Sequence, residues 1–371
     1  MATAKRIDWF MFVLAAGLAL FGALMVYSAS AMMAMKESGD ASQFTYFLKQ
    51  ITFVGIGIAA MFIVSRFDYR LLNDRWVVYG ILFLTCIALL AVFAFDPING
   101  AQRWIRIGGF SFQPSELAKV ALPIFLAWFL TKNENSVGEL KPTVLPVLAG
   151  FGLLAGLVLL EKDLGTTIVL CAIFSVVFFS AGAKMLHIGT VAAGLVVIGV
   201  GAILFAPWRV ARVMAFLDPY KYSDDEAYQV VQSLYAIGSG GVFGEGFAKG
   251  QQKLFYLPYP YSDFIFSVVG EELGLMGTMA VVIAFGLLLW RGVKIVLNAP
   301  DRFGSLLAIG LITGLIAQAL FNISVVISIV PAKGIPLPFI SYGGSSVLIS
   351  LIAVGILLSI SRYSKGNLRE N

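Results

Sequence analysis

Long apolar runs separated by short polar segments extend along almost the whole chain. Most runs are about 20 residues long, which is enough for a helix to cross a hydrocarbon core of about 30 Å. The pattern predicts about ten membrane-spanning helices, at residues 9–32, 46–65, 76–95, 116–130, 144–160, 165–182, 187–206, 264–290, 303–330 and 339–361. Residues 1–371 are therefore interpreted as a single polytopic domain of the all-α integral membrane class.

One polar segment, at residues 207–263, interrupts this pattern between the seventh and eighth spans. Loops longer than about 12–15 residues are usually functional or disordered. This loop has aromatic and aliphatic residues at helical spacing, including Tyr228, Val231 and Tyr235, so we expect short helices along the membrane surface within it. The glycine-rich stretch 238–250 lacks the GK[ST] ending of a P-loop. Its glycines are interpreted as positions of positive φ or of close backbone approach to a ligand.

Composition agrees with a membrane protein, because 59% of the 371 residues are hydrophobic and 13% are charged, whereas soluble domains have about 25% charged residues. Cys86 and Cys171 both lie in apolar runs and predict neither a disulfide framework nor a metal cluster. The single histidine, His187, excludes a histidine-based triad or zinc site. No dinucleotide-binding fingerprint is present, and no nucleic-acid partner is expected.

The distribution of cations predicts how the spans are oriented. Lys and Arg residues near both ends of the chain fall on the same side of the membrane as most cations of the short loops. Cytoplasmic loops are enriched in Lys and Arg, so both termini are predicted to be cytoplasmic and the loop 207–263 to be extracytoplasmic. The terminal cations are Lys5, Arg6, Arg362, Lys365 and Arg369.

Three carboxylates, Asp263, Glu271 and Glu272, stand at the entrance to the eighth span and inside it. An Asp at a helix centre costs about 2.5–3.5 kcal/mol on insertion scales, which makes intramembrane acids functional candidates. Asp263 lies at the mouth of the span, where substrate can reach it, or it caps a helix beginning at Phe264. Glu271 and Glu272 either take part in the chemistry or pair with a buried Lys or Arg.

Candidate cations occur in several of the polar segments. Arg103 and Arg106 lie among aromatic residues, where they either anchor the chain at the membrane interface or bind phosphate through their planar guanidinium groups. Lys119 follows Glu116 at the i, i+3 spacing of a helical ion pair. We expect Arg103, Arg106, Lys119 and Lys253 to lie around one outward-facing cavity, with at least two of them at its wall. Lys333 is either a further phosphate contact or an ordinary interfacial lysine.

Six segments through the last three-quarters of the chain resemble the SEDS family (shape, elongation, division and sporulation), the FtsW, RodA and SpoVE group of peptidoglycan glycosyltransferases. They are NGAQRWIRIGGFSFQPSELAK at 99–119, EKDLGTT at 161–167, RVMAFLDP at 212–219, YQVVQSLYAIGSGGVFGEGF at 228–247, KLFYLPYPYSDFIFSVVGEELG at 253–274 and PAKGIPLPFISYGGSS at 331–346. The amino-acid sequences of these segments resemble FtsW or its sporulation relative more closely than RodA. Two segments depart from the family: Lys162 stands where Pro usually precedes Asp163, and PYPYSDF lacks the usual acidic residue and His.

The resemblance implies polymerisation of lipid II on the outer face of the bacterial cytoplasmic membrane, with release of undecaprenyl diphosphate, in cell division or cell-shape maintenance. It implies that Asp263 is the catalytic residue, as the base that activates a sugar hydroxyl. Substrate binding is expected from Arg103, Arg106, Glu116, Lys119, Lys253, Lys333 and Ser341. Supporting roles are expected from Asp163, Gln232, Glu271 and Glu272.

The resemblance also implies a cognate class B penicillin-binding protein as transpeptidase partner, alongside other divisome or elongasome membrane proteins. No Asp-rich cluster predicts a metal cage, so Mg²⁺ or Mn²⁺ is expected only together with the substrate diphosphate. Two other functions fit many of the same features: transport of lipid II across the membrane, and a non-catalytic scaffold in the division machinery. Transporters often contain inverted repeats, and the two halves of this chain show no convincing one.

Overall fold

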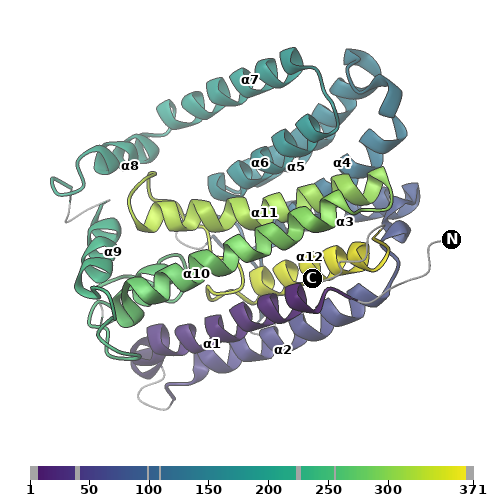
Figure 1. Cartoon of the computed structure of the whole chain (residues 1–371). Helices are drawn as coiled ribbons and strands as arrows, with labels where there is room; N and C mark the ends of the chain where they lie inside the picture. The colour runs from purple at the N-terminus through teal and green to yellow at the C-terminus, as the bar shows by residue number, and fades with distance from the viewer. Residues whose placement is uncertain are drawn as a thin grey trace.

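Long helices occupy the apolar runs in the computed structural model, which describes residues 7–37, 42–97, 100–107, 110–222, 227–254 and 256–364 (Figure 1). Each predicted span coincides with one of these helices. They are α1 (Trp9–Glu37), α2 (Thr45–Arg66), α3 (Arg75–Ala91), α4 (Pro114–Lys132), α5 (Leu145–Leu160), α6 (Leu164–Ser180), α7 (Met185–Leu204), α10 (Ile265–Leu297), α11 (Arg302–Val326) and α12 (Gly344–Arg362).

Eight stretches of the described residues are long and apolar enough to cross a membrane. They contain α1 to α5 and α10 to α12, whereas α6 is apolar but shorter, at 17 residues. The chain is thus a multi-pass membrane protein, while the number of ten spans stays a prediction. The predicted orientation rests partly on Lys5, Arg6, Lys365 and Arg369, which lie outside the described residues.

Short elements connect the long helices. A hairpin precedes α4 and consists of β1 (Ile105–Ile107) and β2 (Phe110–Phe112), paired antiparallel with Arg106 opposite Ser111. The loop 207–263 contains α8 (Pro207–Leu217) and α9 (Tyr228–Ser239), so the short helices expected there are present. The other turns are the 3₁₀ segments η1 (Tyr69–Asn73), η2 (Val92–Ala94) and η3 (Glu134–Ser136) and the π-helical η4 (Leu140–Val144).

The helices form a bundle with α11 near its centre, in contact with α4, α6 and α10, while α12 packs mainly on α2. The core between them is apolar, and its largest fully buried side chains include Phe174, Phe178 and Phe339. Figure 1 shows α7 and α8 set apart from the other helices, with α8 and α9 toward the same end of the bundle. Segments that are distant in the sequence therefore meet at this end, next to the start of α10.

The segment between α11 and α12 is longer than the hydrophobic pattern predicts. The apolar runs predict spans at 303–330 and 339–361, but α11 ends at Val326 and α12 begins at Gly344. Prolines at positions 331, 336 and 338 cannot donate backbone hydrogen bonds, so they oppose helix formation between the two. The chain is irregular here, and its side chains are free to line a site at the end of the bundle.

Helix α10 is broken at Gly274, whose φ of 66° and ψ of −161° are not helical. The glycine-rich stretch 238–250 packs into the break, where the amide of Gly246 donates to the carbonyl of Glu272 at 3.0 Å. A Cβ on Gly244 would come within 2.2 Å of the same carbonyl oxygen, so the residue must be glycine. The close approach seen here is to α10 itself, and positive φ occurs at Gly241, Gly244 and Gly246 as expected. A contact of this stretch with a ligand stays a prediction.

The side chains of Glu271 and Glu272 hold the same loop. The Glu272 carboxylate accepts hydrogen bonds from Nζ of Lys253 at 2.5 Å and from Oγ of Ser28 at 2.6 Å. The Glu271 carboxylate accepts from the backbone amides of residues 251–252, at 2.6 and 3.0 Å. Of the two interpretations of these acids, the geometry supports the structural one, because both carboxylates are occupied in anchoring the chain that leads to Asp263.

Replacement of Lys253 by Met is expected to destabilise the protein strongly, because the buried Glu272 carboxylate then loses its cation. Removing one partner of a buried ion pair costs about 3–5 kcal/mol. Thermal unfolding in detergent measures the effect. The matched control is Lys249→Met, which removes an exposed cation from the same loop. Equal unfolding temperatures for the two variants would contradict this account of the Lys253–Glu272 pair.

Candidate active site

Asp263 lies where the loop 207–263 joins α10. The helix begins at Ile265, and Phe264 occupies the cap position without a side-chain hydrogen bond. Asp263 is therefore not the helix cap that the sequence allowed. The residue lines a cavity instead, and its side chain is available for chemistry there.

The cavity has two adjoining compartments. The Asp263 compartment has a volume of about 380 Å³, and the Lys162 compartment has a volume of about 300 Å³. Arg103, Arg212 and Lys333 line both. The polar and aromatic residues of the Asp263 compartment are Arg103, Trp104, Gln113, Arg212, Gln229, Tyr259, Ser262, Asp263, Phe264, Lys333, Tyr342 and Ser346.

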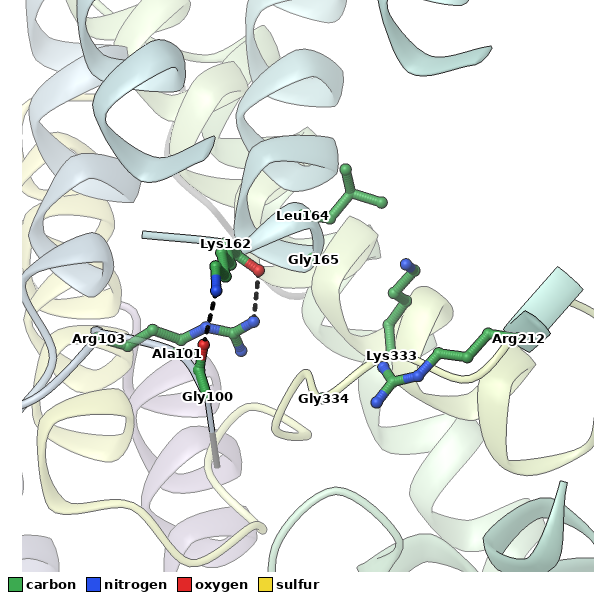
Figure 2. Close-up of a pocket in the computed structure, with 9 residues that line it drawn as sticks. All are labelled: Gly100, Ala101, Arg103, Lys162, Leu164, Gly165, Arg212, Lys333 and Gly334. Atoms are coloured by element: carbon green, nitrogen blue, oxygen red, sulfur yellow. Dashed lines mark hydrogen bonds between the residues drawn. The ribbon is translucent and has the colours of Figure 1, made fainter. Parts of the chain in front are cut away.

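Cations surround the Lys162 compartment. Figure 2 shows Arg103 and Lys162 on one side of it and Lys333 and Arg212 on the other. The guanidinium of Arg103 donates to the carbonyl of Lys162 at 2.5 Å, which fixes the direction of the arginine side chain. Asp263 is the one acidic side chain among the described residues that line the two compartments. The cavity therefore combines a single carboxylate with a strongly cationic wall.

The ionisation of Asp263 and Lys333 reflects these surroundings. Burial raises the pKa of Asp263 to about 6, against the opposing effect of the Arg103 charge, and the nearby Asp163 charge adds to the rise. The pKa of Lys333 is lowered to about 8, mainly by burial and to a smaller extent by the positive charge of Arg212. The positive charges of Arg103, Arg212 and Lys333 together favour the binding of an anion such as a diphosphate.

Buried hydrogen bonds fix the irregular segment between α11 and α12 against Asp263. Nδ2 of Asn322 donates to the carbonyls of Asp263 and Ile335, at 2.7 Å each. Oγ of Ser341 donates to the carbonyl of Ser262 at 2.6 Å. Ser341 was expected to bind substrate, but the structure assigns its hydroxyl to holding the backbone next to Asp263.

Gly334 lies directly against the carboxylate of Asp263. A Cβ at this position would be 2.8 Å from Oδ2 of Asp263, so any side chain would press on the carboxylate. The preceding residue, Lys333, lines both compartments. Two adjacent residues thus set the position of the acid and supply a cation beside it.

Asp163 joins three elements that support the cavity. It caps α6 by accepting from the amide of Thr166 at 3.1 Å, and its other oxygen accepts from Nε2 of Gln113 at 3.0 Å and from Oγ of Ser115 at 3.2 Å. Its carboxylate also lies 3.9 Å from the guanidinium of Arg103. These contacts are those of a positioning residue, in line with the supporting role expected for it.

Glu161 is a buried acid for which the sequence analysis assigned no role. It directly follows α5, and neither of its carboxyl oxygens has a hydrogen-bond partner among the described residues. Burial raises the pKa of Glu161 to about 9, and the Asp163 charge adds to the rise. The side chain is therefore neutral at pH 7, and it does not reduce the positive charge of the neighbouring cavity.

Several predicted substrate-binding residues lie away from the cavity. Lys119 is buried between α4 and α11, where it pairs with Glu116 at 2.7 Å and donates to the side-chain carbonyl of Gln318. Lys253 is held by the buried ion pair beneath the broken helix. Arg106 is exposed on β1 and lines neither compartment. The prediction of four cations around one cavity is therefore wrong, because only one of the four lines it.

Part of the cavity wall is formed by residues that were not predicted from the sequence. Gln229, one turn before the predicted Gln232 on α9, lines the Asp263 compartment. Arg212 reaches both compartments from α8. The signal that could have revealed it is the spacing of Arg209 and Arg212, which places two cations on one face of a short amphipathic helix in the loop.

The described part of the chain has no group of three or more His, Cys, Asp or Glu side chains placed to hold a metal ion. Mg²⁺ prefers oxygen ligands and often binds through substrate phosphates. An ion of Mg²⁺ or Mn²⁺ that enters with the diphosphate of a substrate therefore stays an expectation, and the cavity chemistry is derived from the side chains alone.

Named proteins from other bacteria are similar to this chain in sequence. The stage V sporulation protein E of Bacillus subtilis (strain 168) is 41% identical over 352 residues, which cover 93% of this chain and 94% of that protein. The probable peptidoglycan glycosyltransferase FtsW of Geobacter metallireducens is 40% identical over 372 residues, which cover 98% of this chain and 96% of that protein.

Solved structures share the fold. The structure described as "Structural coordination of polymerization and crosslinking by a peptidoglycan synthase complex" contains a chain with a TM-score of 0.78 and 28% identity, covering 96% of this chain and 98% of that one. The rod shape determining protein RodA of Thermus thermophilus gives a TM-score of 0.70 and 26% identity, with 98% and 99% covered. The sequence pattern of the FtsW, RodA and SpoVE family, described as cell cycle proteins, matches residues 8–366. This chain therefore belongs to the FtsW, RodA and SpoVE family of cell cycle proteins.

Proposed function

We propose that the chain is a peptidoglycan glycosyltransferase that polymerises lipid II into glycan strands and releases undecaprenyl diphosphate, in bacterial cell division or cell-shape maintenance. The observation that carries this proposal is the placement of one carboxylate, Asp263, in a cavity whose walls include Arg103, Arg212 and Lys333. A glycosyl transfer from a lipid diphosphate needs a base for the attacking hydroxyl and cations for the leaving diphosphate.

In the proposed reaction the hydroxyl of the acceptor sugar attacks the anomeric carbon of the donor. The new carbon–oxygen bond forms as the bond to the diphosphate breaks, and the electron pair leaves with undecaprenyl diphosphate. Asp263 accepts the hydroxyl proton, while Arg103, Arg212 and Lys333 stabilise the negative charge that develops on the leaving group. Asp163 acts indirectly in this scheme, by holding Arg103 and the start of α4.

The proposed setting is the bacterial cytoplasmic membrane, with both termini in the cytoplasm and the cavity open to the outer face. The positive-inside rule supports this orientation. A cognate class B penicillin-binding protein is the proposed transpeptidase partner. The structural similarity to a chain from a peptidoglycan synthase complex supports a partner of this kind, and other membrane proteins of the division or elongation machinery are proposed to bind as well.

Synthesis of glycan by the purified protein tests the proposal. The full chain in detergent is incubated with lipid II, alone and with its partner transpeptidase, and glycan polymer is separated by gel electrophoresis. Detergent micelles offer no second compartment, so a lipid II transporter makes no product in this assay, and neither does a scaffold. Polymer formation is the expected result, and its absence both with and without the partner would refute the proposal.

The rate of polymerisation is expected to depend on pH through Asp263 and Lys333. The base is active when ionised, so the rate should rise as pH increases through about 6, the pKa of Asp263. The cation is active when protonated, so the rate should fall as pH increases through about 8, the pKa of Lys333. Initial rates across this range measure the profile. In Lys333→Arg the alkaline fall should disappear, because Arg stays charged. A rate that does not change with pH near 6 would contradict the role of Asp263.

A further inference from the structure

A cluster of four tyrosines lies beside Asp263, and the reaction scheme does not use it. Its rings are in contact: the centroids of Tyr261 and Tyr46 are 4.7 Å apart, those of Tyr261 and Tyr342 are 5.5 Å apart, and those of Tyr261 and Tyr259 are 6.4 Å apart. Tyr261 is thus the centre of the cluster, with 6% of its surface exposed. Two of the others, Tyr259 and Tyr342, line the Asp263 compartment.

Tyr259 differs from its neighbours in exposure. Its side chain is 48% exposed although it lines the compartment that contains Asp263. Its ring stands at 84° to that of Tyr261, which packs against it as a T-shaped pair. A buried aromatic neighbour of this kind restricts the orientation of the ring, so Tyr259 presents a large, oriented apolar surface to the compartment.

The backbone of Tyr259 is also held in an unfavourable conformation. Its φ is +50°, in the left-handed region that bulky residues rarely occupy. The amide of Ser262 donates to the carbonyl of Tyr259 at 3.1 Å and closes a turn that leads directly to Asp263. Glycine would satisfy such a turn at lower cost. Strained backbone of this kind is found at ligand sites, where the surrounding structure maintains it.

We propose that Tyr259 is the platform on which a sugar ring of the substrate stacks, with one of the sugar hydroxyls directed toward Asp263. This inference rests on the proposed glycosyl transfer and assigns the saccharide part of the substrate to the Asp263 compartment. The C–H face of a pyranose ring is apolar and packs on an aromatic ring, while its hydroxyls remain at the edge. Gln113, Gln229 and Ser346 line the same compartment and can hydrogen-bond those hydroxyls.

The chief alternative is that Tyr259 is an aromatic residue of the membrane interface, where Tyr is generally enriched. Tyr256 provides a direct comparison, because it lies three positions earlier in the same loop, is 55% exposed and lines neither compartment. Interfacial anchoring predicts similar consequences from loss of either ring. Sugar stacking predicts that loss of Tyr259 alone affects the substrate.

Kinetics of lipid II polymerisation by purified full-length variants test the platform. A stacking contact of about 1 kcal/mol corresponds to about a fivefold change in binding. Tyr259→Ala should therefore raise KM for lipid II about fivefold with kcat changed less, Tyr259→Phe should behave like the wild type, and Tyr256→Ala should also behave like the wild type. Equal kinetics for Tyr259→Ala and the wild type would overturn the proposal, as would an equally large loss in Tyr259→Phe, which keeps the ring.

Lipid II binding to the Asp263→Asn protein separates failure of this inference from failure of the proposed reaction. Binding is measured in detergent with and without the added Tyr259→Ala substitution. If the wild type makes no polymer, yet Asp263→Asn binds lipid II and the added Tyr259→Ala weakens that binding about fivefold, the platform stands and the reaction is wrong. If the wild type is active and Tyr259→Ala does not weaken binding, the platform is wrong and the reaction stands.

Discussion

Asp263→Asn is expected to abolish or nearly abolish glycan polymerisation while the protein still folds and inserts. Asn is nearly isosteric with Asp but cannot accept the proton of an attacking hydroxyl, and general-base catalysis typically contributes about 10²–10⁴-fold to a rate. The substitution leaves the helix intact, because α10 begins at Ile265 and its cap position is occupied by Phe264. Initial rates with lipid II in detergent, at equal concentrations of folded protein, give the measurement.

Asp74→Asn is the matched control for this experiment. Asp74 is the N-cap of α3 and accepts a hydrogen bond from the amide of Trp76 at 2.8 Å. Asn caps a helix about as well as Asp, so this variant should polymerise lipid II at the rate of the wild type. Near wild-type glycan synthesis by well-folded Asp263→Asn would show that the carboxylate is not the base.

Arg212→Gln and Lys333→Gln are each expected to lower kcat by about 10²–10³-fold, the usual effect of removing one group that stabilises developing negative charge. Both side chains line both compartments. Each therefore lies where a diphosphate that extends from one compartment into the other can contact it. The loss should fall on kcat more than on KM, because the negative charge on the leaving group is greatest in the transition state.

Arg106→Gln serves as the control for the loss of charge alone. Arg106 is an exposed cation on β1 that lines neither compartment, so its replacement removes one positive charge without changing the cavity wall. If it impairs polymerisation as much as Arg212→Gln, then overall attraction of the anionic substrate explains both results, and the specific role of Arg212 is lost. Recovery of activity in Lys333→Arg would further support a requirement for charge at that position.

The spans could be predicted from sequence because each depends on a local property, the hydrophobicity of about 20 consecutive residues. Every predicted span coincides with a helix, and the ends of α11 and α12 show where this reasoning stops. Apolar residues on both sides of the prolines, such as Ile329 and Phe339, continue the hydrophobic run, whereas the backbone cannot continue the helix. Hydrophobicity summed along the chain takes no account of the backbone N–H group that proline lacks, so it does not predict that the helix ends there.

The site was harder to predict, because the sequence does not show which side chains each charged residue contacts in the fold. Asp263 could be identified from the cost of placing an acid at a membrane span, a property of one residue. The fate of Lys253 and Lys119 depends on partners far away in the sequence: Ser28 lies 225 residues from Lys253, and Gln318 lies 199 residues from Lys119. These distant contacts, together with the ion pairs to Glu272 and Glu116, hold both lysines away from the cavity. The spacing of Glu116 and Lys119 predicts one of the two ion pairs, whereas the distant contacts are seen only in the folded chain.

The turn between α5 and α6 limits how far the family can guide redesign of this protein. Lys162 has a φ of +62°, and its amide donates to the carbonyl of Leu159 at 3.0 Å. Proline, which the family resemblance leads us to expect at this position, is fixed at a φ of about −65° and has no amide hydrogen. Substitution toward a consensus sequence is a common route to greater stability, but here it would rebuild the turn whose carbonyl holds Arg103. The conformation of this chain at residue 162 therefore excludes proline, and the residue already present is the better template for redesign.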